Sequence, residues 1–368
     1  MEIFSDLFSN VLNFTWQQGL MIAIGCLLVY LAVKREMEPS LLLPMGFGAV
    51  LVNLPMVHTE AIETLFNTGI ASELFPLLLF IGVGAMIDFG PLLSSPKMFL
   101  FGAAAQFGIF FTLVVAVMAG FDLKDAASAA IIAAADGPTS IYVANYFQSI
   151  YQGAIMVAAY SYMALVPIIQ PPIIRAITTK KERMIRMEYA PSAVSKTTRI
   201  LFPIFVTVIA GTVAPKSAEL IGFLMFGNLI RECGVMGTLS DTAQNVLANL
   251  ITLLLGLTIS FSMRADVFVN VDTLLIMLIG LVAFIFDSIG GVLLAKFINL
   301  FRKKKINPMI GAAGISAFPM SARVVQKMAL EEDPGNIILM HAIGANVSGQ
   351  IASVIAGGLV ISLVAAYL

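Results

Sequence analysis

The sequence predicts an all-α polytopic membrane protein built from two inverted repeats. Three observations lead to this fold class: an apolar composition, a series of long apolar runs, and two apolar segments that are interrupted near their middle. Of the 368 residues, 59% are hydrophobic and only 12% are charged, whereas about 25% of the residues of a soluble domain are charged. This composition excludes an ordinary water-soluble globule and a disordered chain.

The balance of charges excludes a further class of protein. The 21 basic and 22 acidic residues leave a net charge of −1 at pH 7, which offers no surface for a polyanion. We therefore expect the lipid bilayer to surround this chain, and we expect no nucleic-acid partner.

Apolar runs of spanning length recur along the chain. A helix needs about 20 apolar residues to cross the hydrocarbon core of a bilayer. Ten runs approach this length and are predicted as membrane spans: 17–33, 40–57, 74–92, 98–119, 153–177, 200–214, 218–232, 244–261, 272–300 and 337–366. The first run is expected to be retained, because a cleaved secretory signal begins with basic residues and the first basic residue here is Lys34.

Basic residues predict the orientation of these spans. The first, third and ninth runs are each followed by Lys or Arg, and the segment 178–199 holds six such residues. The segment 58–73 contains three Glu residues and no Lys or Arg. Because cytoplasmic loops carry the excess of Lys and Arg, the basic segments are predicted to be cytoplasmic and the N-terminus to lie outside.

Two apolar segments do not fit a simple up-and-down path. Segments 123–152 and 306–335 are each too short to cross the bilayer twice, and each is broken by Gly, Pro, Ser or Asp, at 134–140 and 314–321. The predicted orientation requires the first segment to start and finish outside, and the second to start and finish inside. We therefore predict two re-entrant hairpins, one entering from each side of the membrane.

Hairpins that enter from opposite sides require two halves of inverted topology. A weaker sign of a repeat is that residues 79–84 resemble residues 224–229. We predict a first repeat at 1–177, a cytoplasmic basic linker at 178–199 and a second repeat at 200–368. Paired interrupted segments in inverted halves indicate a substrate site near the middle of the bilayer.

The interrupted hairpins indicate a cation site. Inside a bilayer, a freed backbone carbonyl must be satisfied by protein, water or an ion, and a hard cation such as Na⁺ suits carboxylate, hydroxyl, amide and carbonyl oxygens. The two breaks and their flanks supply such groups in Asp136, Thr139, Ser140, Asn307, Ser316 and Ser321. We therefore predict that the hairpins bind Na⁺.

Three residues in these regions also have simpler interpretations, which stay open. Asp136 precedes Gly-Pro and could be a helix N-cap, although a carboxylate at membrane depth costs at least ~2.5 kcal/mol, which favours a functional role. Arg323, on the returning arm of the second hairpin, could meet an anionic substrate or could extend its charge to the cytoplasmic interface. Tyr162 lies in mid-span, where a buried tyrosine usually needs only one hydrogen-bond partner.

Three stretches carry a resemblance to a known family. They read GVGAMIDFGPL at 82–92, ADGPT at 135–139 and NPMIGAAGISAFP at 307–319, and the last continues in the same pattern as far as Ser353. This chain resembles the membrane-embedded beta subunit of the biotin-dependent sodium-pumping decarboxylases. The resemblance runs over nearly the whole chain.

The resemblance implies an enzyme that is also a sodium pump. In that family a carboxyltransferase alpha subunit loads biotin on a biotin carrier protein with CO₂, and a small single-span membrane subunit helps to assemble the complex. The beta subunit decarboxylates this carboxybiotin, exports Na⁺ and consumes a proton. The implied cofactors are Na⁺ and a biotin that is held by a partner, and the implied location is a bacterial or archaeal cell membrane. The implied fold is similar to that of sodium–carboxylate symporters, with a scaffold domain and a mobile core domain.

The resemblance also implies which residues take part. Asp136, Tyr162 and Arg323 would serve the reaction, and Arg323 and Asn307 would meet the carried carboxybiotin. The implied Na⁺ ligands are Asp136, Asn307, Gly311, Ser316, Asn346 and Ser353.

One alternative function stays open at this point. A secondary sodium–carboxylate symporter, with no chemistry of its own, is compatible with the same fold, because a fold alone does not determine a function. The symporter would move Na⁺ with a soluble anion, whereas the pump needs carboxybiotin on a partner. If the chain is a pump, its compact length favours the glutaconyl-CoA or methylmalonyl-CoA decarboxylases over the oxaloacetate decarboxylases.

The predicted topology can be tested by labelling introduced cysteines. A cysteine at residue 137 should be unreachable from the cytoplasm, and one at residue 318 should be unreachable from outside, in at least one resting state. The measurement is the reaction of each variant with a membrane-impermeant thiol reagent added to one side. Labelling of residue 318 solely from outside would reverse the assignment of the two hairpins.

Overall fold

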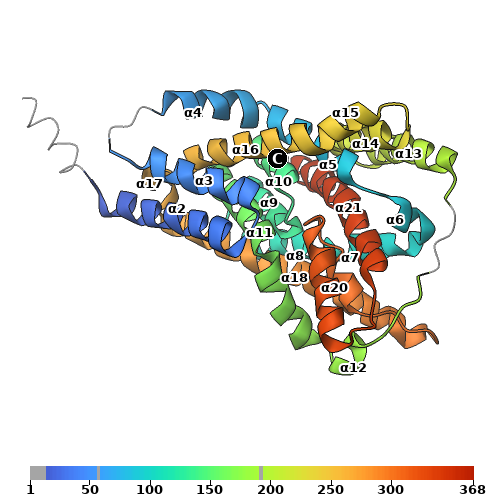
Figure 1. Cartoon of the computed structure of the whole chain (residues 1–368). Coiled ribbons are helices and arrows are strands. Elements are labelled where there is room, and N and C mark those ends of the chain that lie inside the picture. Colours follow the sequence, from blue (N-terminus) through green and yellow to red (C-terminus); the bar gives the residue numbers. More distant parts are fainter. Residues whose placement is uncertain (1–13, 56–58, 190–193) are drawn as a thin grey trace, which may run out of the picture.

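The computed structural model describes residues 14–55, 59–189 and 194–368, and all regular elements in these ranges are helical (Figure 1). Up to residue 177 they are α2 (Trp16–Arg35), α3 (Pro39–Val52), α4 (Glu60–Leu65), η1 (Phe66–Ile70), α5 (Leu74–Met86), α6 (Gly90–Ser94), η2 (Pro96–Met98), α7 (Phe99–Ala105), α8 (Phe107–Met118), α9 (Leu123–Ala130), η3 (Ile131–Ala134), α10 (Gly137–Phe147) and α11 (Gln152–Ile177).

The remaining helices are α12 (Lys180–Arg183), α13 (Lys196–Val213), η4 (Pro215–Ser217), α14 (Ala218–Glu232), α15 (Gly237–Asp241), η5 (Thr242–Leu247), α16 (Ala248–Ile259), η6 (Ser260–Met263), α17 (Ala265–Phe268), α18 (Val271–Phe301), α19 (Met309–Ala312), α20 (Met320–Glu332) and α21 (Leu339–Ala365). In Figure 1, α12 and α20 lie at the lower end of the molecule, while α2, α3 and α17 lie at its left.

Seven helical stretches of the described chain are long and apolar enough to cross a membrane. They are Trp16–Arg35, Pro96–Met118, Gln152–Ile177, Lys196–Val213, Gly237–Met263, Val271–Phe301 and Leu339–Ala365. An eighth is formed if the bent pair Glu60–Ile70 and Leu74–Met86, with a bend of 62°, is counted as one span. The polytopic helical class is therefore confirmed.

The expected spans agree with these helices in most cases. Seven of the ten expected runs coincide with the seven long helices, and the expected run 74–92 begins in the second arm of the bent pair. The other two runs form shorter helices, because α3 has only 14 residues and α14 has only 15. The end of the expected run 40–57 and the predicted outer N-terminus lie outside the described residues.

Small residues allow close packing between helices from the two halves of the chain. A side chain added at Gly84 of α5 would overlap the backbone carbonyl of Leu224, and one added at Gly227 of α14 would overlap that of Ile81. These contacts join the two segments whose sequences resemble each other, 79–84 and 224–229. Such small residues are the usual means of bringing membrane helices together.

Both predicted hairpin segments are broken helices. The first consists of α9 and η3, then Ala135 in the left-handed region with φ of 49°, and then α10. The second consists of α19, an irregular stretch at 313–319, and α20. The interruptions at 134–140 and 314–321 thus occur where Gly, Pro and Asp predicted them. Entry from opposite sides of a membrane stays a prediction.

The two breaks meet inside the protein. The backbone N–H of Ser316 donates to the carbonyl of Ala134 at 3.2 Å. Helix α21 passes beside this contact, since the Asn346 amide donates to the Ile315 carbonyl at 2.6 Å and the Ser316 hydroxyl donates to the Gly349 carbonyl at 3.1 Å. The freed backbone groups are therefore satisfied partly by each other and partly by α21.

Two large groups of buried hydrophobic side chains surround the broken segments. One is formed mainly by α2, α3, α11 and α16. The other is formed mainly by α7, α14, α18, α19, α20 and α21, and it includes Ala135 at the first break. Both groups include residues of α5 and α11, so these two helices lie between them.

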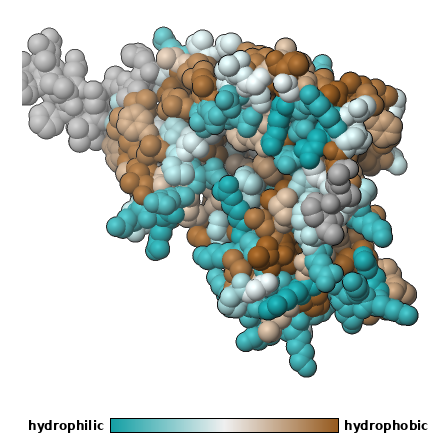
Figure 2. Space-filling view, turned by 45° about the vertical axis from the view of Figure 1, so that its right-hand side comes forward, coloured by the Kyte–Doolittle hydropathy of each residue, from teal (hydrophilic) through white to brown (hydrophobic). Residues whose placement is uncertain are grey.

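The predicted basic linker is held to the end of α20 by ion pairs. Arg183 contacts Glu332 at 2.6 Å, and Arg186 contacts Asp333 at 2.6 Å. Figure 2 shows hydrophilic residues gathered at the lower end of the molecule, where α12 and α20 lie in Figure 1, and hydrophobic residues along its upper margin. Hydrogen bonds from Arg186 also hold the pKa of Asp333 below its usual value.

Candidate functional site

Asp136 lies at the first break and is only 3% exposed. Its carboxylate accepts hydrogen bonds from the Thr139 hydroxyl at 2.7 Å, the Ser353 hydroxyl at 2.9 Å and the Gln350 amide at 3.3 Å. The last two donors come from α21, more than two hundred residues further along the chain. A single buried carboxylate is thus surrounded by neutral groups that carry oxygen.

Asp136 is also the N-cap of α10, which confirms the simpler of the two interpretations given for it from the sequence. Its side chain accepts from the backbone N–H of Thr139 at 3.5 Å, and Pro138 occupies the first turn. An N-cap needs no contact with another helix, however. The hydrogen bonds from Gln350 and Ser353 show that this carboxylate also joins the first break to α21.

Two further polar atoms near the breaks are buried and lack a partner among the described residues. They are the side-chain oxygen of Asn346 and the hydroxyl of Tyr160. The Tyr160 ring packs directly over Gly137, where any added side chain would overlap it. Most buried polar atoms have a hydrogen-bond partner, so these two oxygens remain available to a group bound near the breaks. A cysteine at residue 137 would overlap the Tyr160 ring, so the labelling experiment on the first hairpin is better done with a cysteine at residue 138.

A cavity of about 200 Å³ opens beside Asp136. Asp136, Ser316 and Gln350 line it together with Tyr160, so it reaches both breaks and α21. Glu38 and Ser40, at the beginning of α3, line the same cavity. Because Ser40, Met86 and Asn249 are exposed lining residues, the cavity opens to the surface.

The structure brings four of the residues predicted for this site together. Ser316 lines the same cavity as Asp136, Ser353 bonds to Asp136, and Asn346 holds the second break at Ile315. Thr139 and Ser140 also contact Asp136, the latter through a bond of 2.8 Å from its hydroxyl to the Asp136 carbonyl.

Three other predicted residues lie elsewhere. The Tyr162 hydroxyl donates to the Met277 carbonyl at 2.6 Å and does not line the cavity, whereas Tyr160 does. The Asn307 amide donates to the Arg183 carbonyl at 2.8 Å and so holds the linker. Gly311 packs against Gly291 of α18, with no space for a side chain. None of these three residues bonds to Asp136 in the structure. The part of Tyr162 in the reaction and the binding of Na⁺ by Asn307 and Gly311 stay predictions.

The hydroxyl of Ser321 is engaged in packing the second segment. It donates to the side-chain oxygen of Gln170 at 2.9 Å, and the Gln170 amide donates to the carbonyl of Ala312 at 2.7 Å. Ser321 was expected among the possible Na⁺ ligands, but its oxygen joins α20 to α11 instead. Gln170 is a buried polar residue that sequence reasoning missed.

Asp287 is the other buried acid among the described residues, and it has a different environment. One of its carboxylate oxygens accepts from the backbone N–H of Gly108 at 2.6 Å, at the start of α8. No hydroxyl or amide side chain of the described residues bonds to it. Asp287 therefore compensates the beginning of a helix, and the oxygen-rich surroundings belong to Asp136.

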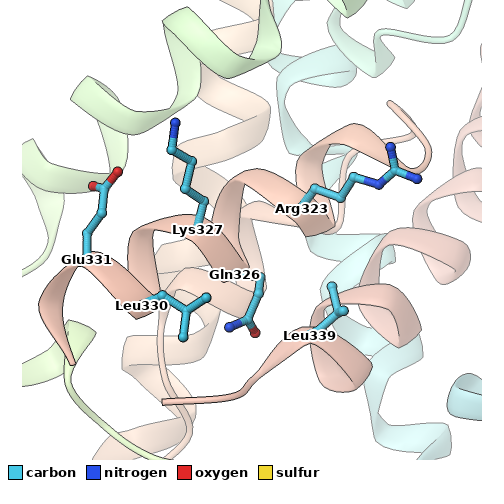
Figure 3. Close-up of a pocket in the computed structure, with 6 residues that line it drawn as sticks. All are labelled: Arg323, Gln326, Lys327, Leu330, Glu331 and Leu339. Carbon is cyan, nitrogen blue, oxygen red and sulfur yellow. The ribbon is translucent and has the colours of Figure 1, made fainter. Parts of the chain in front are cut away.

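Arg323 lies on the first turn of α20 and is exposed. Its guanidinium makes no hydrogen bond or ion pair with any residue that the structure describes. Figure 3 shows it at the end of α20 near the second break, with Lys327 and Glu331 further along the helix. These residues, with Gln326, Leu330 and Leu339, line a surface pocket of about 440 Å³. A free guanidinium in such a pocket can hold a carboxylate through two parallel hydrogen bonds.

The donor set of the cavity indicates the kind of cation. Within the described ranges, no group of three or more His, Cys, Asp or Glu residues could hold a metal ion. A transition metal prefers nitrogen or sulfur ligands, whereas one carboxylate with hydroxyl, amide and carbonyl oxygens suits a hard cation of low charge. The residues around Asp136 therefore fit Na⁺.

A comparison with known families decides the broad class. The chain matches the family described as the Na⁺-transporting oxaloacetate decarboxylase beta subunit over residues 17–364. The chain belongs to this family. The resemblance found in the sequence is thereby confirmed, and the seven long apolar helices fit a multi-pass membrane subunit of a Na⁺-transporting decarboxylase.

Relatives within the family act on different acids, according to their names. The chain is 46% identical to the glutaconyl-CoA decarboxylase subunit beta of Acidaminococcus fermentans, with 97% of this chain and 96% of the relative covered. It is 46% identical to the methylmalonyl-CoA decarboxylase subunit beta of Veillonella parvula, with 99% of each covered. It is 41% identical to a probable oxaloacetate decarboxylase beta chain of Vibrio cholerae, with 96% and 97% covered.

The contact between Asn346 and the second break should stabilise the folded protein. Asn346→Ala leaves the buried Ile315 carbonyl without its donor and should lower the free energy of unfolding by about 1–3 kcal/mol. Asn249→Ala is the matched control, because Asn249 is exposed and its side chain bonds to no described residue. The measurement is the thermal unfolding of the purified protein. Equal effects of the two substitutions would contradict this role of Asn346.

Proposed function

We propose that this chain decarboxylates carboxybiotin on a biotin carrier protein and couples the reaction to Na⁺ export, with uptake of a proton. The observation that carries the proposal is the buried Asp136 carboxylate, which is surrounded by neutral oxygen-bearing groups where two broken helices meet. Membership of a family of Na⁺-transporting decarboxylase subunits supports it.

Na⁺ is the transported ion in this proposal, and Asp136 is its charged ligand. The hydroxyls of Thr139 and Ser353 donate to the same carboxylate, so their oxygens lie beside it, and Ser316 and Asn346 supply further oxygens at the second break. A carboxylate in this position must be neutralised by Na⁺ or by a proton, since an isolated buried charge is costly. Binding of one therefore excludes the other, which links Na⁺ release to proton uptake.

Arg323, on the first turn of α20, is proposed to bind the carboxylate of the substrate. Carboxybiotin, which a partner subunit carries, supplies the CO₂ and the free energy of its release. The exposed guanidinium of Arg323 has no partner among the described residues and is free to bind the carboxylate. Because the Asn307 amide is already bonded to the linker carbonyls of Arg183 and Ile185, we assign Asn307 the role of shaping this surface.

The partners and topology follow from the same proposal. The chain would work with a carboxyltransferase alpha subunit, the biotin carrier and a small single-span membrane subunit, in an oligomeric complex of a bacterial or archaeal cell membrane. The two broken segments would be re-entrant hairpins of inverted repeats, and they would belong to a mobile core domain that moves against a scaffold, as in sodium–carboxylate symporters. The N-terminus would lie outside.

We further propose that the upstream acid is an acyl-CoA. The chain is 46% identical to the glutaconyl-CoA and methylmalonyl-CoA relatives. The alignment with the Vibrio cholerae oxaloacetate relative runs over 421 positions although this chain has 368 residues, so that relative contains segments with no counterpart here. The absence of these segments from the aligned sequence supports an acyl-CoA decarboxylase complex.

Asp136→Asn tests the Na⁺ site. Asn is about as good an N-cap as Asp, so the variant should fold and assemble, but the loss of charge should abolish Na⁺ transport and Na⁺-stimulated decarboxylation together. The measurement is uptake of radioactive sodium into inverted vesicles, alongside the decarboxylation rate across a Na⁺ titration. Asp122→Asn, at the exposed N-cap of α9, is the matched control. Normal transport by Asp136→Asn would refute the proposed mechanism.

Arg323→Lys tests the carboxylate site. Lysine keeps the charge but cannot make two parallel hydrogen bonds to a carboxylate, so carboxybiotin turnover should fall by about tenfold or more. Binding of Na⁺ to the purified protein should change little. Arg175→Lys, an exposed arginine paired with Glu331, serves as the control. Turnover equal to that of the unmodified protein would show that Arg323 only extends its charge to the interface.

A further inference from the structure

Glu38 lies in an unusual loop and lines the cavity beside Asp136. The three residues Glu36, Met37 and Glu38 connect α2 to α3, and both glutamates have positive φ, 52° and 38°. Such left-handed backbone is unfavourable for residues other than glycine and persists where the surroundings impose it. The loop leaves Glu36 exposed, whereas Glu38 is half-buried and lines the cavity.

The side chain of Glu38 has no structural role that would explain this position. Glu38 is the N-cap residue of α3, yet its side chain makes no capping hydrogen bond. Within the described chain, its carboxylate also forms no hydrogen bond or ion pair with another side chain. A half-buried carboxylate without a partner is unfavourable, and this indicates a function in the cavity.

Glu38 lines the cavity together with Phe318 and Pro319, which immediately precede the first turn of α20, where Arg323 lies. Burial raises the pKa of Glu38, and the Arg323 guanidinium opposes this shift. The two residues come from separate elements, the start of α3 and the first turn of α20, and the backbone of Arg323 bonds to Pro319, which lines the cavity with Glu38. The other titratable side chains that line this cavity are Asp136 and Tyr160.

This arrangement has a consequence for any carboxylate that Arg323 binds. The bound carboxylate would lie near a second negative charge, that of Glu38, which weakens its binding. In decarboxylation the bond between the carboxyl carbon and the ureido nitrogen breaks, the electron pair stays on the nitrogen, which takes up a proton, and neutral CO₂ leaves. Arg323 then loses its negative partner, while the negative charge of Glu38 still acts on it.

We propose that Glu38 is the counter-charge of Arg323: it weakens the binding of the substrate carboxylate and stabilises Arg323 as that carboxylate becomes CO₂. Glu38 is a positioning residue here, because it acts through Arg323 and exchanges no atom with the substrate. An interaction accelerates a reaction only if it is stronger in the transition state than in the ground state. Glu38 meets this condition, because its repulsion of the substrate weakens as the carboxylate loses its charge, while its attraction to Arg323 stays the same. The inference rests on the proposed binding of carboxybiotin by Arg323.

Kinetics of Glu38→Gln provide the first test. Without the competing charge, the substrate carboxylate binds more tightly and the transition state loses its compensation, so KM for the carboxylated carrier and kcat should both fall, each by about two- to fivefold. Glu36→Gln, two residues earlier in the same loop, should change neither. A fall in kcat with KM unchanged or raised would overturn the proposal, because a merely structural role of Glu38 would produce that result.

The second test needs no turnover. In a background with Cys26→Ser and Cys233→Ser, which removes the two native cysteines, Glu38→Cys is allowed to react with an anionic and with a cationic methanethiosulfonate reagent. The positive charge of Arg323 should favour the anionic reagent, and adding Arg323→Gln should lower the ratio of the two rates by about two- to fivefold. Glu36→Cys is the matched control, and its ratio should not respond to Arg323→Gln.

The two tests separate this inference from the proposed function. An unchanged rate ratio at residue 38 after Arg323→Gln would overturn the pairing of Glu38 with Arg323, even if Arg323→Lys impairs turnover as expected. If the unmodified complex fails to decarboxylate carboxybiotin, the proposed function fails, and the role of Glu38 in that reaction fails with it. The rate ratio would still report whether the two charges lie together.

Discussion

The rest of the structure depends on how backbone groups freed at two helix breaks are satisfied away from water. The N–H of Ser316 bonds to the carbonyl of Ala134, so each break is completed by the other. Helix α21 supplies the remaining groups, since Asn346 bonds to the second break and Ser353 bonds to Asp136 beside the first. An unsatisfied backbone group costs several kcal/mol in a bilayer, so these three elements must stay together, and Asp136 is fixed among hydroxyl and amide groups as a result.

The cavity beside Asp136 extends to Phe318 and Pro319, which immediately precede the helix that carries Arg323. Asp136 and Glu38 line the same cavity, and Glu38 experiences the charge of Arg323. In the proposed function, the cation and the carboxylate are therefore bound by separate residues. A buried carboxylate suits a hard cation or a proton, while an exposed guanidinium suits a carboxylate. In the proposed function, the coupling between the two sites comes from exchange of Na⁺ and a proton on Asp136.

The breaks and most spans could be predicted from sequence because their signals are local. Gly137, Pro138 and Pro319 interrupt apolar runs, and hydropathy alone identified seven long helices. Gln350 could have been found as well, since Asn346, Gln350 and Ser353 follow one another at the spacing of a single helix face. The sequence could not show which residues, distant from one another along the chain, would form hydrogen bonds or pack together. The hydroxyl of Ser321 bonds to Gln170, 151 residues away, and Tyr160 rather than Tyr162 faces the cavity, because distant packing decides both.

Binding of Na⁺ at Asp136 is the central claim, and its most direct test is the thermal stability of the purified complex as a function of Na⁺. A ligand that binds only the folded state raises the unfolding midpoint with its concentration. At constant ionic strength, with choline replacing Na⁺, the midpoint of the unmodified protein should rise with Na⁺ concentration, and that of Asp136→Asn should stay constant. Asp122→Asn should behave as the unmodified protein does. An equal rise in Asp136→Asn would contradict the account, because Na⁺ would then bind without this carboxylate.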